Sequence, residues 1–286
     1  MTPPDQQEAP VTQGDRTHRS DVGHGREHKK WGRRIGAGLI LLGSFVPFGG
    51  ISLRNLLTRS TSGETVEYMK DEPACPRCGG PVHPPGLWNS AWHCVEHGPV
   101  PPLQPVAKPG TECLEHVRSH ATVPLWMPQP LPTSWVVTGY AHAGDERTGG
   151  VATLVGCSGP APLGGVADLV LIAESPGVGL GAWLAGLPGP DPGDGFDNGP
   201  AHAKLVAAGH PTAMWNVDAG PDNAVYVGEA KGAWIWALLW PSAAGVLLLE
   251  NLDLEDLVER GDSLEGLDLP HGALVPRLAA LGAPRQ

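Results

Sequence analysis

Four residues between positions 75 and 97 have the types and the spacing of a metal site. Cys75 and Cys78 lie in the turn CPRC, and Cys94 and His97 lie in a second turn with the same two-residue gap. Thiolate sulfur and imidazole nitrogen are the ligands that a tetrahedral structural zinc prefers, and each short turn presents two of them together. The pattern predicts a zinc ribbon over residues 69–98, with a structural Zn2+ bound by Cys75, Cys78, Cys94 and His97.

The residues around the four ligands fit this prediction. Gly79 and Gly98 follow the two pairs, where a positive φ lets backbone amides turn back toward the sulfurs. The segment between the pairs is expected to form a hairpin packed over the metal, through Val82, Leu87, Trp88 and Trp92. A disulfide and a redox dithiol are the alternatives. They are disfavoured because a CxxH pair cannot oxidise to a disulfide and because a redox CxxC is expected beside a βαβ pattern.

The composition favours many short elements over long helices. The 286 residues include 40 Gly and 31 Pro, and 10 Trp outnumber the three Tyr and three Phe, so most Trp side chains are expected to be at least half-buried. Cys113 and Cys157 lie outside the predicted zinc site and are expected to be small apolar side chains. An odd number of cysteines together with a zinc motif favours a reducing compartment, and we predict a cytoplasmic protein.

The charge is distributed unevenly along the chain. Residues 1–68 contain nine Lys or Arg and seven Asp or Glu, whereas the remainder contains 10 basic and 23 acidic residues, a net charge of −13. Zinc ribbons often serve nucleic-acid machinery, but a phosphate backbone requires a basic surface. Only Lys70 and Arg77 lie near the predicted metal, so we predict no direct binding to nucleic acid.

The first 68 residues leave three interpretations open. Residues 1–34 are polar and are expected to be disordered. Residues 35–53 carry no charge, lie between Lys and Arg residues, and are just long enough to span a bilayer as a single-pass membrane anchor. Met69 directly precedes the predicted ribbon and is an alternative start of translation to Met1, which would make residues 1–68 a mis-annotated extension. A disordered cytoplasmic tail is the third interpretation.

Residues 99–123 are predicted to be a Pro-rich linker that acts as a semi-rigid spacer. Residues 112–120 within it favour one or two helical turns, on which Cys113, His116 and His120 share a face. A second metal site is one interpretation of these three side chains. It lacks a fourth ligand, so ordinary surface residues are the default expectation.

Residues 124–286 are predicted to form an α+β domain, with a mainly antiparallel sheet and few helices. An apolar extended strap over 125–132 opens it. Strands are expected over 135–140, 151–157, 169–173, 203–207, 213–217, 224–228 and 234–240, and helices over 180–187 and 253–260. Both faces of the 234–240 strand are apolar, so it is expected to lie inside the sheet.

No catalytic residue is predicted in this domain. The glycines of 177–181 favour a tight turn over a phosphate cradle, because the spacing is not GxGxxG and the βαβ pattern is absent. Cys157, Ser158 and His202 are the candidates for nucleophilic catalysis, with Asp145 or Glu174 to orient a base, but nothing in the sequence brings them together.

The segments CPRCGG, WHCVEHG, CSGPAPLGG and WIWALLWP resemble those of an uncharacterised actinobacterial family. That family couples an N-terminal zinc ribbon to a domain of unknown function, and its members begin near the position of Met69. The resemblance covers the chain from about residue 69 to its end and implies no established activity. Some relatives carry a phosphotransacetylase label, for which no motif is present. The last third also resembles the curved antiparallel sheets of lipoprotein carriers.

Two functions are consistent with the sequence. The first is a non-enzymatic zinc-binding module that scaffolds or regulates a protein partner, as a closed metal site and an acidic surface indicate. The second is an enzyme or small-ligand-binding protein that uses a Trp-lined cleft with His202, Cys157 and Asp145. A concave pocket that joins these three side chains would favour the second.

Overall fold

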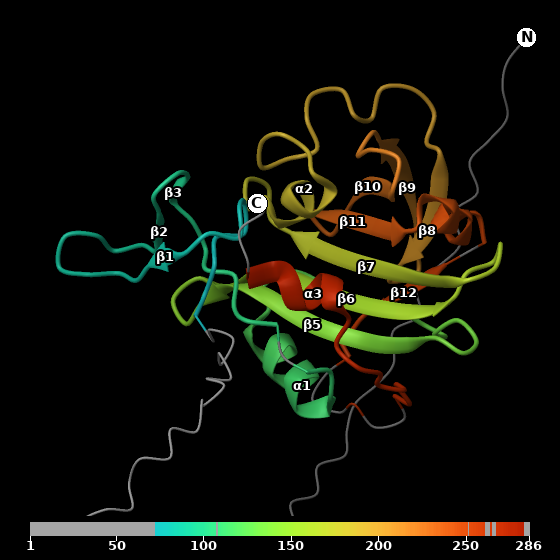
Figure 1. Cartoon of the computed structure of the whole chain (residues 1–286), viewed down its shortest axis with the longest axis horizontal. Helices are drawn as coiled ribbons and strands as arrows, with labels where there is room; N and C mark the ends of the chain where they lie inside the picture. Colours follow the sequence, from blue (N-terminus) through green and yellow to red (C-terminus); the bar gives the residue numbers. More distant parts are fainter. Residues whose placement is uncertain (1–71, 107, 251, 261–263, 265–266, 283–286) are drawn as a thin grey trace, which may run out of the picture. The chain divides into compact units, whose positions relative to one another are not determined.

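The computed structural model describes residues 72–106, 108–250, 252–260, 264 and 267–282 (Figure 1). The predictions for residues 1–68, including the apolar segment 35–53, and the choice between Met1 and Met69 lie outside these residues. None of the helices among the described residues is long and apolar enough to cross a membrane.

Two sheets make up most of the described structure. A small antiparallel sheet contains β1 (Val82–His83), β2 (His93–Cys94) and β3 (Gly98–Pro99) in that order. A nine-stranded sheet contains β4 (Trp126–Pro128), β5 (Val136–Asp145), β6 (Gly149–Pro160), β7 (Val166–Glu174), β8 (Ala203–Ala207), β9 (His210–Val217), β10 (Ala224–Ala230), β11 (Ala233–Trp240) and β12 (Asp253–Asp256).

The nine strands lie in the order β4-β12-β8-β9-β10-β11-β7-β6-β5, and every neighbouring pair is antiparallel except β12 and β8. The helical elements are short. They are α1 (Thr111–His120), α2 (Leu180–Ala185), α3 (Pro276–Ala279) and the 3-10 helices η1 (Ser242–Leu249) and η2 (Ala280–Gly282). The prediction of a mainly antiparallel sheet with few helices is therefore confirmed.

β11 lies between β10 and β7, inside the sheet, as its two apolar faces predict. Ile235 and Leu239 point into the core that contains Trp126 and β4. Trp236 and Leu238 point to the opposite side of the sheet, into the core that contains α2. A strand that is apolar on both faces needs such a place, because an edge or a solvated face would leave one side exposed to water.

Residues 253–260 form a strand and a turn, so the predicted helix is wrong. Leu254 and Asp256 of β12 are buried while Asp253 is exposed, which is the alternation of a strand. β12 pairs antiparallel with β4 and parallel with β8. Hydrogen bonds to two neighbouring strands satisfy the backbone on both edges, and this pairing outweighs the helical spacing of the leucines.

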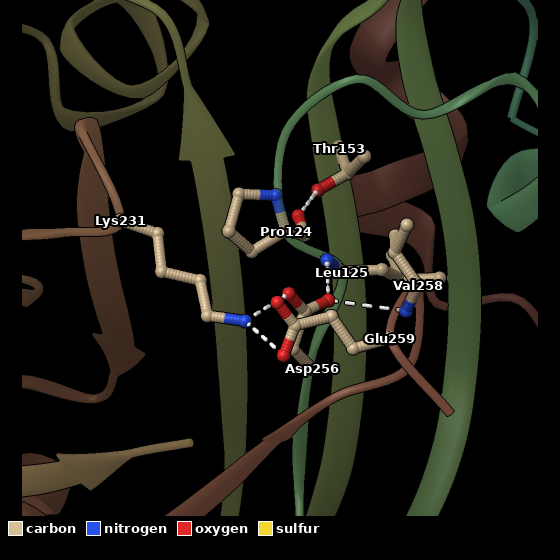
Figure 2. A network of polar contacts seen from close by, with 7 residues as sticks. All are labelled: Pro124, Leu125, Thr153, Lys231, Asp256, Val258 and Glu259. Carbon is tan, nitrogen blue, oxygen red and sulfur yellow. Dashed lines mark hydrogen bonds and ion pairs between the residues drawn. The ribbon is translucent and has the colours of Figure 1, made fainter. Parts of the chain in front are cut away.

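Asp256 connects the end of β12 to two other segments (Figure 2). Its carboxylate accepts hydrogen bonds from the N–H groups of Leu125 and Val258, both at 3.0 Å, and pairs with Lys231 Nζ at 2.8 Å. Lys231 lies in the β10–β11 turn and also contacts Glu259 at 2.6 Å. Because Asp256 is only 5 % exposed, this network fixes β12 against the start of β4.

Part of the segment predicted to be a spacer is packed against the large sheet. Leu103 is 2 % exposed and forms backbone bridges to both Ala74 and Ala143. α1 buries Leu114 and Val117 in the core on its side of the sheet. Buried apolar side chains thus anchor this segment to the sheet, and the spacer predicted from its high proline content is wrong for these residues.

Candidate metal centre

The structure brings the side chains of the two predicted turns together. The potential ligand atoms of Cys75, Cys78, Cys94 and His97, here called the Cys/His cluster, all lie within 4.8 Å of one another. Cys78 Sγ lies 3.8 Å from Cys94 Sγ. His97 Nδ1 lies 3.7 Å from Cys75 Sγ and 3.6 Å from Cys94 Sγ. Four donors that converge at these distances are compatible with a metal site.

Tight backbone turns position the cluster. The Gly79 N–H donates to the Cys75 carbonyl at 2.8 Å, and the Cys75 N–H donates to the Gly80 carbonyl at 2.7 Å. The Arg77 N–H points at Cys75 Sγ, at 3.4 Å. Gly79 and Gly98 have φ values of 69° and 68°, so each pair is followed by the left-handed glycine that the sequence predicts.

The three thiols of the cluster differ in pKa because their surroundings differ. Burial raises the pKa of Cys75 to about 12, and burial also raises the pKa of Cys78. Burial opposes the ionisation of Cys94, but hydrogen bonds from His97 and from backbone N–H groups outweigh it and lower the pKa to about 7. A bound cation would favour all three thiolates, because a metal–sulfur bond requires deprotonated sulfur.

Two sets of contacts tie the cluster to the nine-stranded sheet. Ala74 exchanges backbone hydrogen bonds with Leu103 at 2.9 and 2.8 Å, and Leu103 in turn pairs with β5. The Arg77 guanidinium donates to the carbonyls of Gly177 and Val178, with an Nε–O distance of 3.2 Å to the second. The first chelating turn is therefore attached to the large sheet directly before and within the turn.

The loop between β1 and β2 does not pack over the cluster as predicted. Leu87 is 97 % exposed and Trp88 is 99 % exposed. Of the residues predicted to pack there, Val82 does lie beside the cluster, together with Val100. The loop extends away from the short strands β1 and β2 (Figure 1). β1 and β2 have only two residues each, so they do not carry the loop back over the cluster. The apolar side chains at the tip of the loop therefore stay in solvent.

The predicted candidates for nucleophilic catalysis are not assembled. Cys157 is 1 % exposed inside the core. Ser158 Oγ donates to Asp168 at 2.6 Å, and His202 Nδ1 accepts the N–H of Asn216 at 3.1 Å. Within the residues that the structure describes, no hydrogen bond joins any two of these three side chains.

The glycine turn at 177–181 surrounds a buried carboxylate. Glu174 is 0 % exposed and accepts the N–H groups of Leu180 and Gly181 at 2.8 and 3.1 Å, at the start of α2. Burial raises its pKa to about 7, against the opposing effect of these two donors. A Cβ on Gly181 would lie 2.4 Å from the Trp236 indole, so close packing requires glycine there.

His116 and His120, two of the three side chains that helical spacing groups on α1, lie beside a third histidine, His142, which the sequence does not predict to join them. Cys113 turns toward the core, whereas His116 and His120 meet His142 of β5. The predicted strand ended at Tyr140, and β5 continues beyond it. The alternation of strand side chains places His142 on the same face of β5 as Tyr140, but no local pattern in the sequence predicts that this face lies against α1.

Neither a curated protein nor a solved structure matches the chain. The model of a family of unknown function, DUF6758, matches residues 69–278, which include the Cys/His cluster and nearly all of the described sheet domain. The chain belongs to this family of unknown function.

Proposed function

We propose that the Cys/His cluster binds one structural Zn2+ and that residues 69–98 are a zinc ribbon. Two sulfurs bound at about 2.3 Å to a tetrahedral zinc lie about 3.8 Å apart, and a sulfur and a nitrogen lie about 3.6 Å apart. The distances between Cys78 and Cys94 and between His97 and Cys94 are 3.8 and 3.6 Å. Four protein ligands leave no open position for a reacting molecule, which supports a structural role for the metal.

The ribbon presents an apolar tip, which supports a scaffolding or regulatory function over catalysis at this metal. Leu87 and Trp88 are almost fully exposed on the β1–β2 loop. Trp is strongly enriched among the residues that anchor protein interfaces. The chain after residue 68 carries a net charge of −13, so the partner that fits is a protein with an apolar pocket for Trp88 and a basic rim around it.

The cysteines support a reducing compartment, in line with a cytoplasmic protein. All five are free, and three belong to the proposed zinc site, where oxidation would remove metal ligands.

Zinc content in a set of variants of the full chain tests the proposal. A thiol-blocking mercurial should release one equivalent of zinc from the wild type. Cys94→Ser and His97→Ala should each lack this equivalent, while the large sheet still melts cooperatively. His93→Ala is the matched control, because His93 lies beside Cys94 on β2 but outside the cluster. The proposed ribbon would be contradicted if the mercurial failed to release the bound zinc of the wild type. It would also be contradicted if His93→Ala lost more zinc than His97→Ala.

One observation favours the alternative, an enzyme or ligand-binding protein. A hollow of about 550 Å³ lies where the ribbon loop meets the end of β5. Trp92 and Asp145 line it, but Cys157 and His202 do not, so the cleft expected from the sequence would have to use other side chains.

A further inference from the structure

Three histidine rings meet at one end of the large sheet. His116 and His120 lie one helical turn apart on α1, and their ring centroids are 4.4 Å apart. His142 comes from β5, and its ring centroid lies 5.4 Å from that of His116 and 5.8 Å from that of His120. None of the three belongs to the Cys/His cluster.

The surroundings of the rings leave coordinating nitrogens available. His120 Nδ1 donates to the His116 carbonyl at 2.8 Å, which puts the proton on Nδ1 and the lone pair on Nε2. A backbone carbonyl that holds one ring nitrogen in this way is the usual support for a metal-binding histidine. His142 is 6 % exposed, and burial, followed by the charges of the other two histidines, lowers its pKa to about 4, so the ring is neutral at pH 7.

The separations of the rings match those around a metal ion. With Zn–N distances of about 2.1 Å and tetrahedral angles, three coordinating imidazole rings have centres about 5 Å apart. The observed centroid distances of 4.4, 5.4 and 5.8 Å bracket this separation. Their nitrogens do not form a group as tight as the Cys/His cluster, but His116 is exposed and its side chain is free to turn inward.

We propose that His116, His120 and His142 form a second metal site, which binds Zn2+ or another divalent ion that prefers imidazole nitrogen. Imidazole ligands suit zinc, cobalt and nickel, whereas calcium and magnesium prefer oxygen. Three protein ligands leave a coordination position open, in contrast to the four of the ribbon.

The open position faces the hollow of about 550 Å³ described above. Its lining includes the three histidines together with Trp92, Asp145 and Arg147. A water molecule or a small anion on the metal would lie in this hollow, which Arg147 also lines. The ribbon loop contributes one wall of the hollow through Trp92, so the structural metal would help to shape the second site.

Cobalt binding to the full, zinc-loaded chain tests the second site. Calorimetry and visible absorption should show one saturable equivalent of Co2+ whose spectrum lacks a sulfur-to-cobalt charge-transfer band. His116→Ala and His120→Ala should each weaken this binding by at least about tenfold, since even outer-shell partners of a metal change affinity by about 10- to 100-fold. His210→Ala, at an exposed histidine on β9, is the matched control and should leave it unchanged.

The proposal would be overturned by the absence of saturable Co2+ uptake, or by uptake that persists in the double variant His116→Ala/His120→Ala. A charge-transfer band on that equivalent would place the cobalt at cysteine and would equally refute the site. Because both helix histidines lie at least partly at the surface, these variants keep the fold, and a thermal melt verifies it. A mercurial should release the ribbon zinc and spare the cobalt, so failure of either site is recognised separately.

Discussion

At the scale of single residues, Glu174 is a fully buried carboxyl group with a raised pKa. It is 0 % exposed and accepts hydrogen bonds from the backbone N–H groups of Leu180 and Gly181. Burial, followed by the charge of Asp191, raises its pKa from 4.5 to about 7 against the opposing effect of the hydrogen bonds that it accepts. The carboxyl group is therefore held in its neutral form over a pH range in which an exposed glutamate is ionised.

This raised pKa predicts how stability depends on pH. Between pH 4.5 and about 7 the folded chain keeps a proton that the unfolded chain releases, so the contribution of Glu174 is fully present below pH 4.5 and is lost as the pH rises. The loss across this range is about 3 kcal/mol. The free energy of unfolding of Glu174→Gln, relative to the wild type, should therefore increase by about that amount between pH 4.5 and 7.

Urea titrations at several pH values check this prediction. Both proteins contain the same histidines, so the pH-dependent contribution of the histidines cancels in the difference between the two free energies of unfolding. Glu229→Gln is the control, since Glu229 is exposed on β10. A relative stability of Glu174→Gln that stays flat across this range would show that the carboxyl ionises normally.

At the scale of elements, the junction of β12 and β4 depends on Asp256 (Figure 2). Asp256→Ala removes the acceptor for two backbone N–H groups and the partner of Lys231. Because one of those groups is the fully buried Leu125, we expect a loss of about 2–4 kcal/mol in the free energy of unfolding. Chemical denaturation measures it.

Asp253→Ala on the same strand is the control for this prediction. Its side chain is exposed, so the change should stay within about 0.5 kcal/mol. Equal effects of the two substitutions would show that the strand tolerates the loss of its buried carboxylate, and that the network of Figure 2 does not hold the junction.

The elements that sequence predicts well are those whose signal is local. The bounds of β8 agree with the predicted strand 203–207, because this strand is a short apolar run with a glycine on either side of it in the sequence. The four residues of the Cys/His cluster were found from spacing alone, since each turn contains its own pair. β12 was missed because its strand character depends on β4, which lies more than a hundred residues earlier in the chain.

The histidines show the same limit for a site. His116 and His120 are four residues apart and their proximity follows from the helix. His142 joins them only because β5 passes beneath α1, and no local pattern contains that information. Helical spacing groups Cys113 with these two histidines. Leu114 and Val117 determine which side of α1 faces the sheet, and Cys113 packs against the core on that side.

At the scale of the whole molecule, the acidic balance after residue 68 leads us to predict that the chain does not bind nucleic acid directly. Binding to a phosphate backbone releases counterions only where Lys and Arg neutralise phosphates, and this part of the chain carries a net charge of −13. We therefore expect no shift of random duplex or single-stranded nucleic acid in gels at low salt. Salt-dependent, sub-micromolar binding would contradict this expectation, and loss of that binding on deleting residues 1–68 would locate it in the basic N-terminal part.

The position of β12 has a consequence for the order in which the chain folds. Among the described strands, β4 lies at an edge of the sheet and pairs with β12, which follows it by more than a hundred residues. Trp126 on β4 is 1 % exposed in the finished core. At roughly 5–20 residues per second of synthesis, this tryptophan waits several seconds on the ribosome before its partner strand emerges. The core on that side of the sheet is thus completed only after β12 has been translated, and a chain truncated before Asp253 would leave β4 without the strand with which it pairs.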